Sequence, residues 1–134
     1  MLGYYLEPSQ NSFFANSVTL ETMVKHMTDE INFGSFDCPE VKCGFIGEIG
    51  CCYPLYGNFS KFCHFLEKYH LRCISILEFE KKAIVASAMA QEATGAPVSF
   101  HPGRDPDAPF EIMRIFAEAG GNTKKSICSH LESK

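Results

Sequence analysis

Three residues whose side chains commonly bind metal ions lie at or near the ends of short apolar runs. They are Glu48 in the run 42–50, His101 in the run 96–101 and His130 in the run 125–130. The run that ends at His101 is broken at once by Pro102 and Gly103. A buried parallel strand that delivers one polar side chain to a loop has this pattern. Imidazole and carboxylate groups are zinc ligands, so all three residues are candidate metal ligands.

A site built from these residue types has a definite chemistry. Catalytic zinc leaves one coordination position open for water, and binding lowers the pKa of that water towards about 7. A hydroxide nucleophile is then present at neutral pH and can attack a phosphoryl or acyl centre. The sequence contains no contiguous HExxH or CxxC motif. From spacing alone, a hydrogen-bonded loop histidine and an exposed glutamate therefore remain the alternative interpretation.

The elements between these residues alternate between strand and helix patterns. Apolar residues at Leu20, Met23, Val24, Met27 and Ile31 predict an amphipathic helix, with Ser17 or Thr19 as its cap and Gly34 at its end. A second helix is expected from about 78 to 94, and a third from the Pro-rich segment 105–109 through 119. On that third helix Phe110, Met113 and Ala117 are expected on one side. The aromatic stretch 3–6 reads as a further strand.

This order predicts an α/β protein with parallel βα units, whose site lies at the carboxyl ends of the strands. His101 and His130 are 29 positions apart (130 − 101), close to the roughly 31 residues of one barrel unit. Glu48 and His101 are 53 positions apart (101 − 48), which is too many for one unit. The surplus matches residues 56–77, which are rich in aromatic residues, His and Cys. We therefore expect one domain over 1–134 with an atypical inserted segment at about 56–77.

Composition limits the class of protein. A chain of 134 residues with 46% hydrophobic and 21% charged residues is an ordinary globular domain. The net charge of −4 is mild and the basic residues form no run, so neither nucleic acid nor an anionic membrane is an expected partner. No signal peptide or membrane span is apparent. The seven cysteines are an odd number at irregular spacing, which favours free thiols and a cytoplasmic location.

Several blocks of the sequence resemble the phosphotriesterase-related proteins of the amidohydrolase superfamily. The blocks are VKCGFIGEIGC at 41–51, FHPGR at 100–104 and SHL at 129–131. The resemblance extends over 3–5 and 24–34 and is interrupted at about 56–77. It implies a (β/α)8 barrel, of which this chain would hold about strands three to six. It also implies a two-zinc centre in which Glu48 takes the metal-bridging place and His101 and His130 bind one metal.

The resemblance further implies hydrolysis of ester-like or amide bonds in a small-molecule substrate, such as an N-acylated one. Members of the family also carry a His-x-His pair on the first strand and an Asp on the last. This sequence contains no His-x-His pair, so no catalytic residue is assigned and an incomplete, inactive piece is expected. Half a barrel leaves edge strands unpaired. We therefore expect poor stability alone, or association with another copy or with a full-length protein.

Other interpretations remain open from the residues themselves. Arg104 could bind an anionic substrate group through its planar fork, or pair with a nearby acidic residue on the surface. A small zinc module could be formed by residues of the 56–77 segment, namely Cys63, His64, His70 and Cys73, although their spacing fits no familiar finger. A non-catalytic metal-binding or interaction protein is the alternative to a hydrolase. His26 lies off the apolar stripe of its helix and is expected on the surface.

Overall fold

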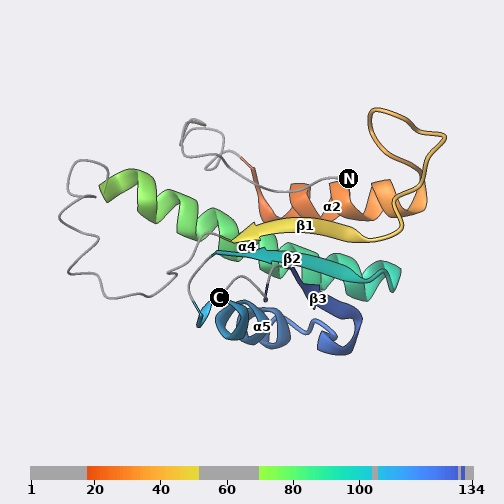
Figure 1. Ribbon diagram of the computed structural model, residues 1–134. Coiled ribbons are helices and arrows are strands. Elements are labelled where there is room, and N and C mark those ends of the chain that lie inside the picture. Colours follow the sequence, from red (N-terminus) through yellow and green to blue (C-terminus); the bar gives the residue numbers. More distant parts are fainter. Residues whose placement is uncertain (1–17, 52–69, 104–105, 130, 132–134) are drawn as a thin grey trace.

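The computed structural model describes residues 18–51, 70–103, 106–129 and 131, with only the backbone for 70–78 (Figure 1). In chain order its elements are α2 (Leu20–Asn32), β1 (Ile46–Cys51), α4 (His70–Thr94), β2 (Val98–Pro102), α5 (Ala108–Glu118), the 3-10 helix η1 (Thr123–Lys125) and β3 (Ser126–Cys128). The strand expected at 3–6 lies outside the described residues. No helix within the described part of the chain is long and apolar enough to cross a membrane.

The three strands form one parallel sheet in the order β1-β2-β3. The connection from β1 to β2 contains α4, and the connection from β2 to β3 contains α5. Figure 1 shows α4 running along the back of β1 and β2, with α2 above it and α5 below. Parallel strands require crossover connections of this kind. The predicted α/β class with parallel βα units is therefore confirmed.

Helix α2 has the boundaries that its sequence predicted. The Thr19 hydroxyl oxygen accepts a hydrogen bond of 3.2 Å from the backbone N–H of Thr22, which caps the first turn. Met23 and Met27 are buried against the core. The chain leaves the helix through Gly34, whose φ of +120° suits glycine. His26 is exposed, as expected.

Helix α4 is longer than predicted. It begins at His70 rather than at about Glu78, and it ends at Thr94 as expected. Gly95 follows with a φ of +71° and donates its N–H to the carbonyl oxygen of Gln91 at 2.7 Å. Residues 70–77 contain no Gly or Pro, so nothing in them stops a helix. The change in composition near residue 77 therefore does not mark the start of the helix.

Helix α5 buries a different face from the one expected. Its buried residues are Ala108, Ile112 and Phe116, whereas Phe110 is 79% exposed and Ala117 is exposed too. Of the three residues expected on one side, Met113 is partly buried and packs against the core, whereas Phe110 and Ala117 are exposed, so that side is not the packed one. The apolar residues of this short helix occur on more than one of its faces. Their spacing alone therefore does not decide which face is buried. The packing of α5 on β2 selects the stripe that contains Phe116.

The core lies between the sheet and its helices. Small side chains of α4 allow its backbone to approach the strands closely, and Ala83, Ala86 and Ala90 are fully buried. On β2 the Phe100 ring meets the Phe116 ring edge to face, with centroids 5.1 Å apart and planes at 74°. Strand β2 is thereby held against α5.

Candidate metal centre

The side chain of His101 projects from the sheet face that is turned away from the helices. Along β2 the residues Val98, Phe100 and Pro102 are buried, while Ser99 and His101 are half-buried. Successive side chains of a strand point to opposite faces. Because Phe100 packs on α5, His101 belongs to the opposite face. In a closed barrel of this type that face is the interior.

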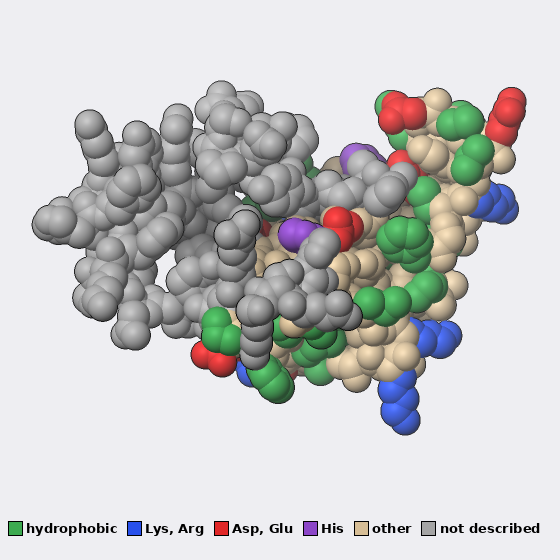
Figure 2. Space-filling view, viewed as in Figure 1, with side chains coloured by type: hydrophobic (Ala, Val, Ile, Leu, Met, Phe, Trp, Pro, Cys, Tyr) green, Lys and Arg blue, Asp and Glu red, His purple; other side chains and the backbone are tan. Residues whose placement is uncertain are grey.

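Glu48 lies on the same face as His101. Gly50 of β1 pairs in register with His101, and paired residues of adjacent strands share a face. Glu48 precedes Gly50 by two positions and therefore shares that face as well. Gly50 has no side chain, so position 50 adds no bulk beside His101. On the side shown in Figure 2, histidine and acidic side chains reach the surface.

A bulge in β1 sets the orientation of Glu48. The pairing with β2 shifts by one residue between Ile46 and Ile49, and Gly47 within this shift has a φ of +129°. Bulges re-aim side chains next to functional sites. Glu48 is the third of the six residues of β1, whereas we expected it at the carboxyl end of the strand. His101, the fourth of five residues in β2, lies near the strand end as expected.

The remaining candidate residues lie where the structure gives no side-chain placement. His130 and Arg104 are outside the described residues, as are Cys63 and His64 of the alternative zinc module. His70 and Cys73 of that module are described only by their helical backbone. Among the residues with described side chains, no group of three or more His, Cys, Asp or Glu could hold a metal ion.

The donor atoms on the sheet face that is turned away from the helices fit a divalent cation such as zinc. Glu48 supplies carboxylate oxygen and His101 supplies imidazole nitrogen, both ligand types of catalytic zinc sites. They come from adjacent parallel strands, and both are half-buried. Catalytic zinc usually takes three protein ligands. His130, which follows β3 by two positions in the sequence, is the candidate for the third.

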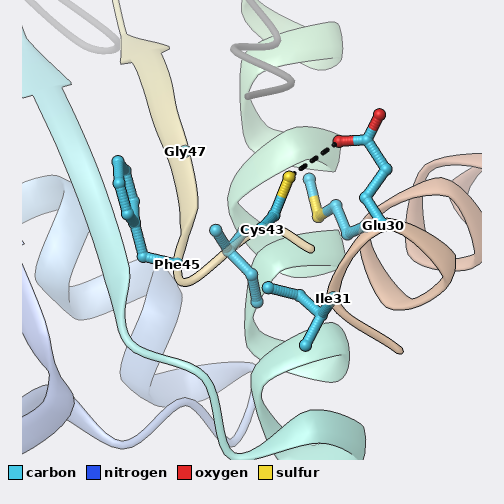
Figure 3. Close-up of a pocket in the computed structure, with 7 residues that line it drawn as sticks. Glu30, Ile31, Cys43, Phe45 and Gly47 are labelled. Carbon is cyan, nitrogen blue, oxygen red and sulfur yellow. Dashed lines mark hydrogen bonds between the residues drawn. The ribbon is translucent and has the colours of Figure 1, made fainter. Parts of the chain in front are cut away.

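A small pocket lies between α2 and the start of β1, away from His101 (Figure 3). The carboxylate of Glu30 lies at its edge and accepts hydrogen bonds from the Phe36 N–H at 3.2 Å and from the Cys43 thiol at 3.4 Å. The space inside it that a water-sized sphere can reach is only about 10 Å³, far below the roughly 300 to 1,000 Å³ of small-molecule sites. The pocket is therefore too small to bind a substrate.

Sequence reasoning overlooked Glu30, although a signal was present. Met23, Met27 and Glu30 have the spacing of one helical stripe, and all three are buried. A carboxylate on the apolar stripe of a helix requires hydrogen-bond donors from elsewhere in the fold. In this protein the donors come from the segment that leads into β1, so Glu30 fixes the path of the chain towards Glu48.

Known proteins resemble this chain in sequence and in fold. The sequence model of the Phosphotriesterase family matches residues 63–134. The N-acetyltaurine hydrolase of Xenopus tropicalis is 37% identical to this chain, and a phosphotriesterase-related protein of Drosophila persimilis is 39% identical. Each alignment covers 97% of this chain. The chain spans 31% of the length of each of these relatives.

A solved structure extends the comparison to the fold. The phosphotriesterase homology protein of Escherichia coli, whose crystal structure contains phosphate in its active site, superposes with a TM-score of 0.68 at 22% identity. The superposition covers 96% of this chain and 37% of that one. The parallel βα units described above are thus those of part of a TIM barrel. Since the family match includes more than half of its residues, this chain belongs to the Phosphotriesterase family.

Proposed function

We propose that this chain supplies metal ligands of a zinc-dependent hydrolase of the phosphotriesterase-related type. The observation that carries the proposal is that Glu48 and His101 lie on one sheet face, on adjacent parallel strands. His130 is the third proposed ligand. The reaction is hydrolysis of an ester-like or amide bond in a small-molecule substrate, in the cytoplasm. The names of the relatives, N-acetyltaurine hydrolase among them, support small N-acylated substrates.

The bound zinc would supply an activated water as the nucleophile. Residues of this chain would bind the zinc and fix its position. The Glu48 carboxylate, which follows the bulge at Gly47, and the His101 imidazole would supply donor atoms from the same face of the sheet. The packing of Phe100 on Phe116 fixes β2 from behind, so the imidazole is carried on a rigid strand. Rigid support of this kind keeps ligands within the tolerance that a metal site requires.

We further propose that the chain alone is inactive. No catalytic residue is assigned, and the sequence contains no His-x-His pair. The domain is proposed to be one partial barrel unit over 1–134 with an inserted segment at about 56–77. Purified chain is expected to show no turnover with ester, phosphotriester or N-acyl substrates after zinc addition. Measured turnover, abolished by Glu48→Ala, would contradict the proposed inactivity.

Zinc binding tests the ligand assignment directly. Zinc content after dialysis, measured by inductively coupled plasma mass spectrometry, is expected to fall to background in Glu48→Ala, His101→Ala and His130→Ala. His26→Ala is the matched control, because it removes an exposed imidazole from α2. Unchanged zinc in the three variants, or an equal loss in the control, would contradict the assignment. Loss in Cys63→Ala or His70→Ala alone would favour the separate zinc module.

A second candidate function is that of a non-catalytic metal-binding or interaction protein that associates with itself or with a full-length copy. It is favoured by the exposure of Ile127, which is 65% accessible on β3, an edge strand of the described sheet. Exposed apolar edge strands are templates for pairing with another chain. Light scattering after gel filtration is expected to show oligomers that Ile127→Lys disperses. A monodisperse wild-type monomer would exclude self-association.

A further inference from the structure

Three large apolar side chains are exposed on the loop that joins α2 to β1. Phe33 is 73% exposed, Phe36 89% and Val41 58%. Asp37 and Glu40 lie between them in the sequence and are exposed as well. Single exposed apolar residues are common on proteins, whereas several close together mark interaction sites. These five residues form what we call the acidic loop surface.

The loop that carries the acidic loop surface is closed by hydrogen bonds. Ser35 donates its N–H to the carbonyl oxygen of Val41 at 2.8 Å. Glu30, which is buried, accepts from the Phe36 N–H at 3.2 Å through its carboxylate and from the Cys43 N–H at 3.0 Å through its carbonyl oxygen. The exposed side chains are therefore carried by a preorganised loop, which lowers the entropic cost of binding a partner.

A second exposed surface combines basic and apolar side chains around the start of β3. Lys124 and Lys125 end η1 and are exposed, and Ile127 on β3 is 65% exposed. The Gln91 side chain donates to the Lys125 carbonyl oxygen at 3.1 Å, and the Lys125 ammonium donates to the Gly95 carbonyl oxygen at 3.4 Å. We call Lys124, Lys125 and Ile127 the basic edge surface.

The two surfaces lie beyond opposite edges of the sheet. In the described sheet β1 and β3 are the edge strands, with β2 between them. In Figure 1 the loop before β1 lies at the upper right and the segment before β3 at the lower right, both at the ends where the strands begin. Figure 2 shows acidic and hydrophobic side chains together at the upper right and basic side chains at the lower right. Because the sheet lies between them, the two surfaces meet only when two copies of the chain come together.

The two surfaces are complementary in charge. Segment 33–41 contains two acidic residues and no basic one, with Lys42 directly after it, and segment 122–127 contains two basic residues and no acidic one. Within the described part of the chain, Asp37 and Glu40 form no ion pair. Opposite charges on two surfaces steer their association and select the partner.

We propose that copies of this chain associate head to tail, with the acidic loop surface of one copy against the basic edge surface of the next. This contact is one form of the self-association of the second candidate function, on which it rests, and it does not depend on zinc. A contact between two different surfaces is heterologous, so it closes into a ring or continues as a chain of copies. Apolar side chains on both surfaces, Phe36 and Ile127 among them, would be removed from water.

Light scattering after gel filtration, over a series of protein concentrations, tests the contact with two charge-reversed variants. Asp37→Lys with Glu40→Lys makes both surfaces basic, and Lys124→Glu with Lys125→Glu makes both acidic. Each variant alone is expected to associate at least about tenfold more weakly than the wild type, because like charges face each other. An equimolar mixture restores opposite charges at every contact and is expected to form the oligomers of the wild type.

The variant with all four substitutions is the matched control. It keeps the net charge of −4, because two changes to Lys and two to Glu cancel, and it should associate like the wild type. A mixture and a fourfold variant that stay dissociated while the wild type associates would overturn the head-to-tail contact and leave self-association through another surface. A wild type that is monomeric at every concentration would overturn this contact and the second candidate function together.

Phe36→Ser tests the apolar part of the contact without changing a charge. Because the Phe36 side chain is exposed, the urea midpoint of the chain should not change. Association is expected to weaken at least about tenfold, as for an aromatic residue at the centre of an interface. Phe110→Ser is the matched control, since Phe110 is 79% exposed on α5 and lies outside both surfaces. Equal association of the two variants would overturn the role of the acidic loop surface.

Discussion

Gly47 of β1 lies against the carbonyl oxygen of Ser99 in β2, so close that a Cβ at position 47 would be 2.4 Å from that oxygen. The φ of Gly47 is +129°, a conformation that side-chain-bearing residues rarely adopt. Both facts tie the bulge before Glu48 to glycine. Position 47, directly before the proposed ligand Glu48, therefore requires glycine.

Gly47→Ala is expected to destabilise the fold by about 1 to 3 kcal/mol or more, because strain and a backbone clash act together. Gly44→Ala is the control, since a Cβ at Gly44 would meet no atom within 4 Å. Urea unfolding followed by circular dichroism measures the difference. Equal midpoints for the two variants would show that the bulge tolerates a side chain.

Phe116→Ala is expected to cost about 3 to 5 kcal/mol, because it opens a cavity beside Phe100 and removes an edge-to-face contact. Phe110→Ala removes the same side chain from an exposed position of α5 and should change stability by less than about 0.5 kcal/mol. Urea titrations of both variants test which face of α5 is packed. Comparable losses would contradict the orientation of the helix.

Glu30→Ala is expected to cost about 1 to 3 kcal/mol and to speed hydrogen exchange in residues 33–43. The Phe36 N–H loses its acceptor in a partly buried place. Asp29→Ala is the control, since Asp29 forms only a surface ion pair with Lys25, worth about 0.5 kcal/mol or less. Unchanged exchange in 33–43 would mean that Glu30 does not hold this loop.

Stability should depend on pH through Glu111. Two hydrogen bonds from Arg114, at 2.8 and 2.6 Å, hold the pKa of this carboxyl below its ordinary value of 4.5. A carboxyl with a depressed pKa stabilises the fold above pH 4.5, and this contribution disappears as the pH falls through the lowered pKa. The melting temperature of Glu111→Gln should therefore lie below that of the wild type at pH 7 and converge with it as the pH falls below the lowered pKa of Glu111. A constant gap would contradict this linkage.

The free thiols should differ in reactivity. Burial raises the pKa of the Cys128 thiol, which lowers its thiolate fraction. Cys51 is 1% exposed, whereas Cys38 is exposed. Iodoacetamide at pH 8 should label Cys38 first and Cys51 and Cys128 only slowly, as peptide mass spectrometry would show. In urea the three thiols should be labelled at similar rates, and a slow Cys38 in the native chain would contradict its placement.

The sequence alone determined the order of the elements and the types of the candidate ligands. The spacing of Met23 and Met27 marks an amphipathic helix, and Pro102 and Gly103 mark the end of a strand. These signals are local, because a few neighbouring residues carry them. The α/β class with parallel strands followed from them, and the structure confirms it.

The tertiary structure alone decided the features that depend on contacts between distant residues. The face of α5 that packs is chosen by Phe100, which is distant in the sequence from Phe116. The close approach of Gly47 to Ser99 joins two strands that are distant in the sequence. The buried side-chain amide of Gln91 bonds to two backbone groups more than 30 positions away. Periodicity carries no information about such contacts, because they form only when the strands and helices have assembled.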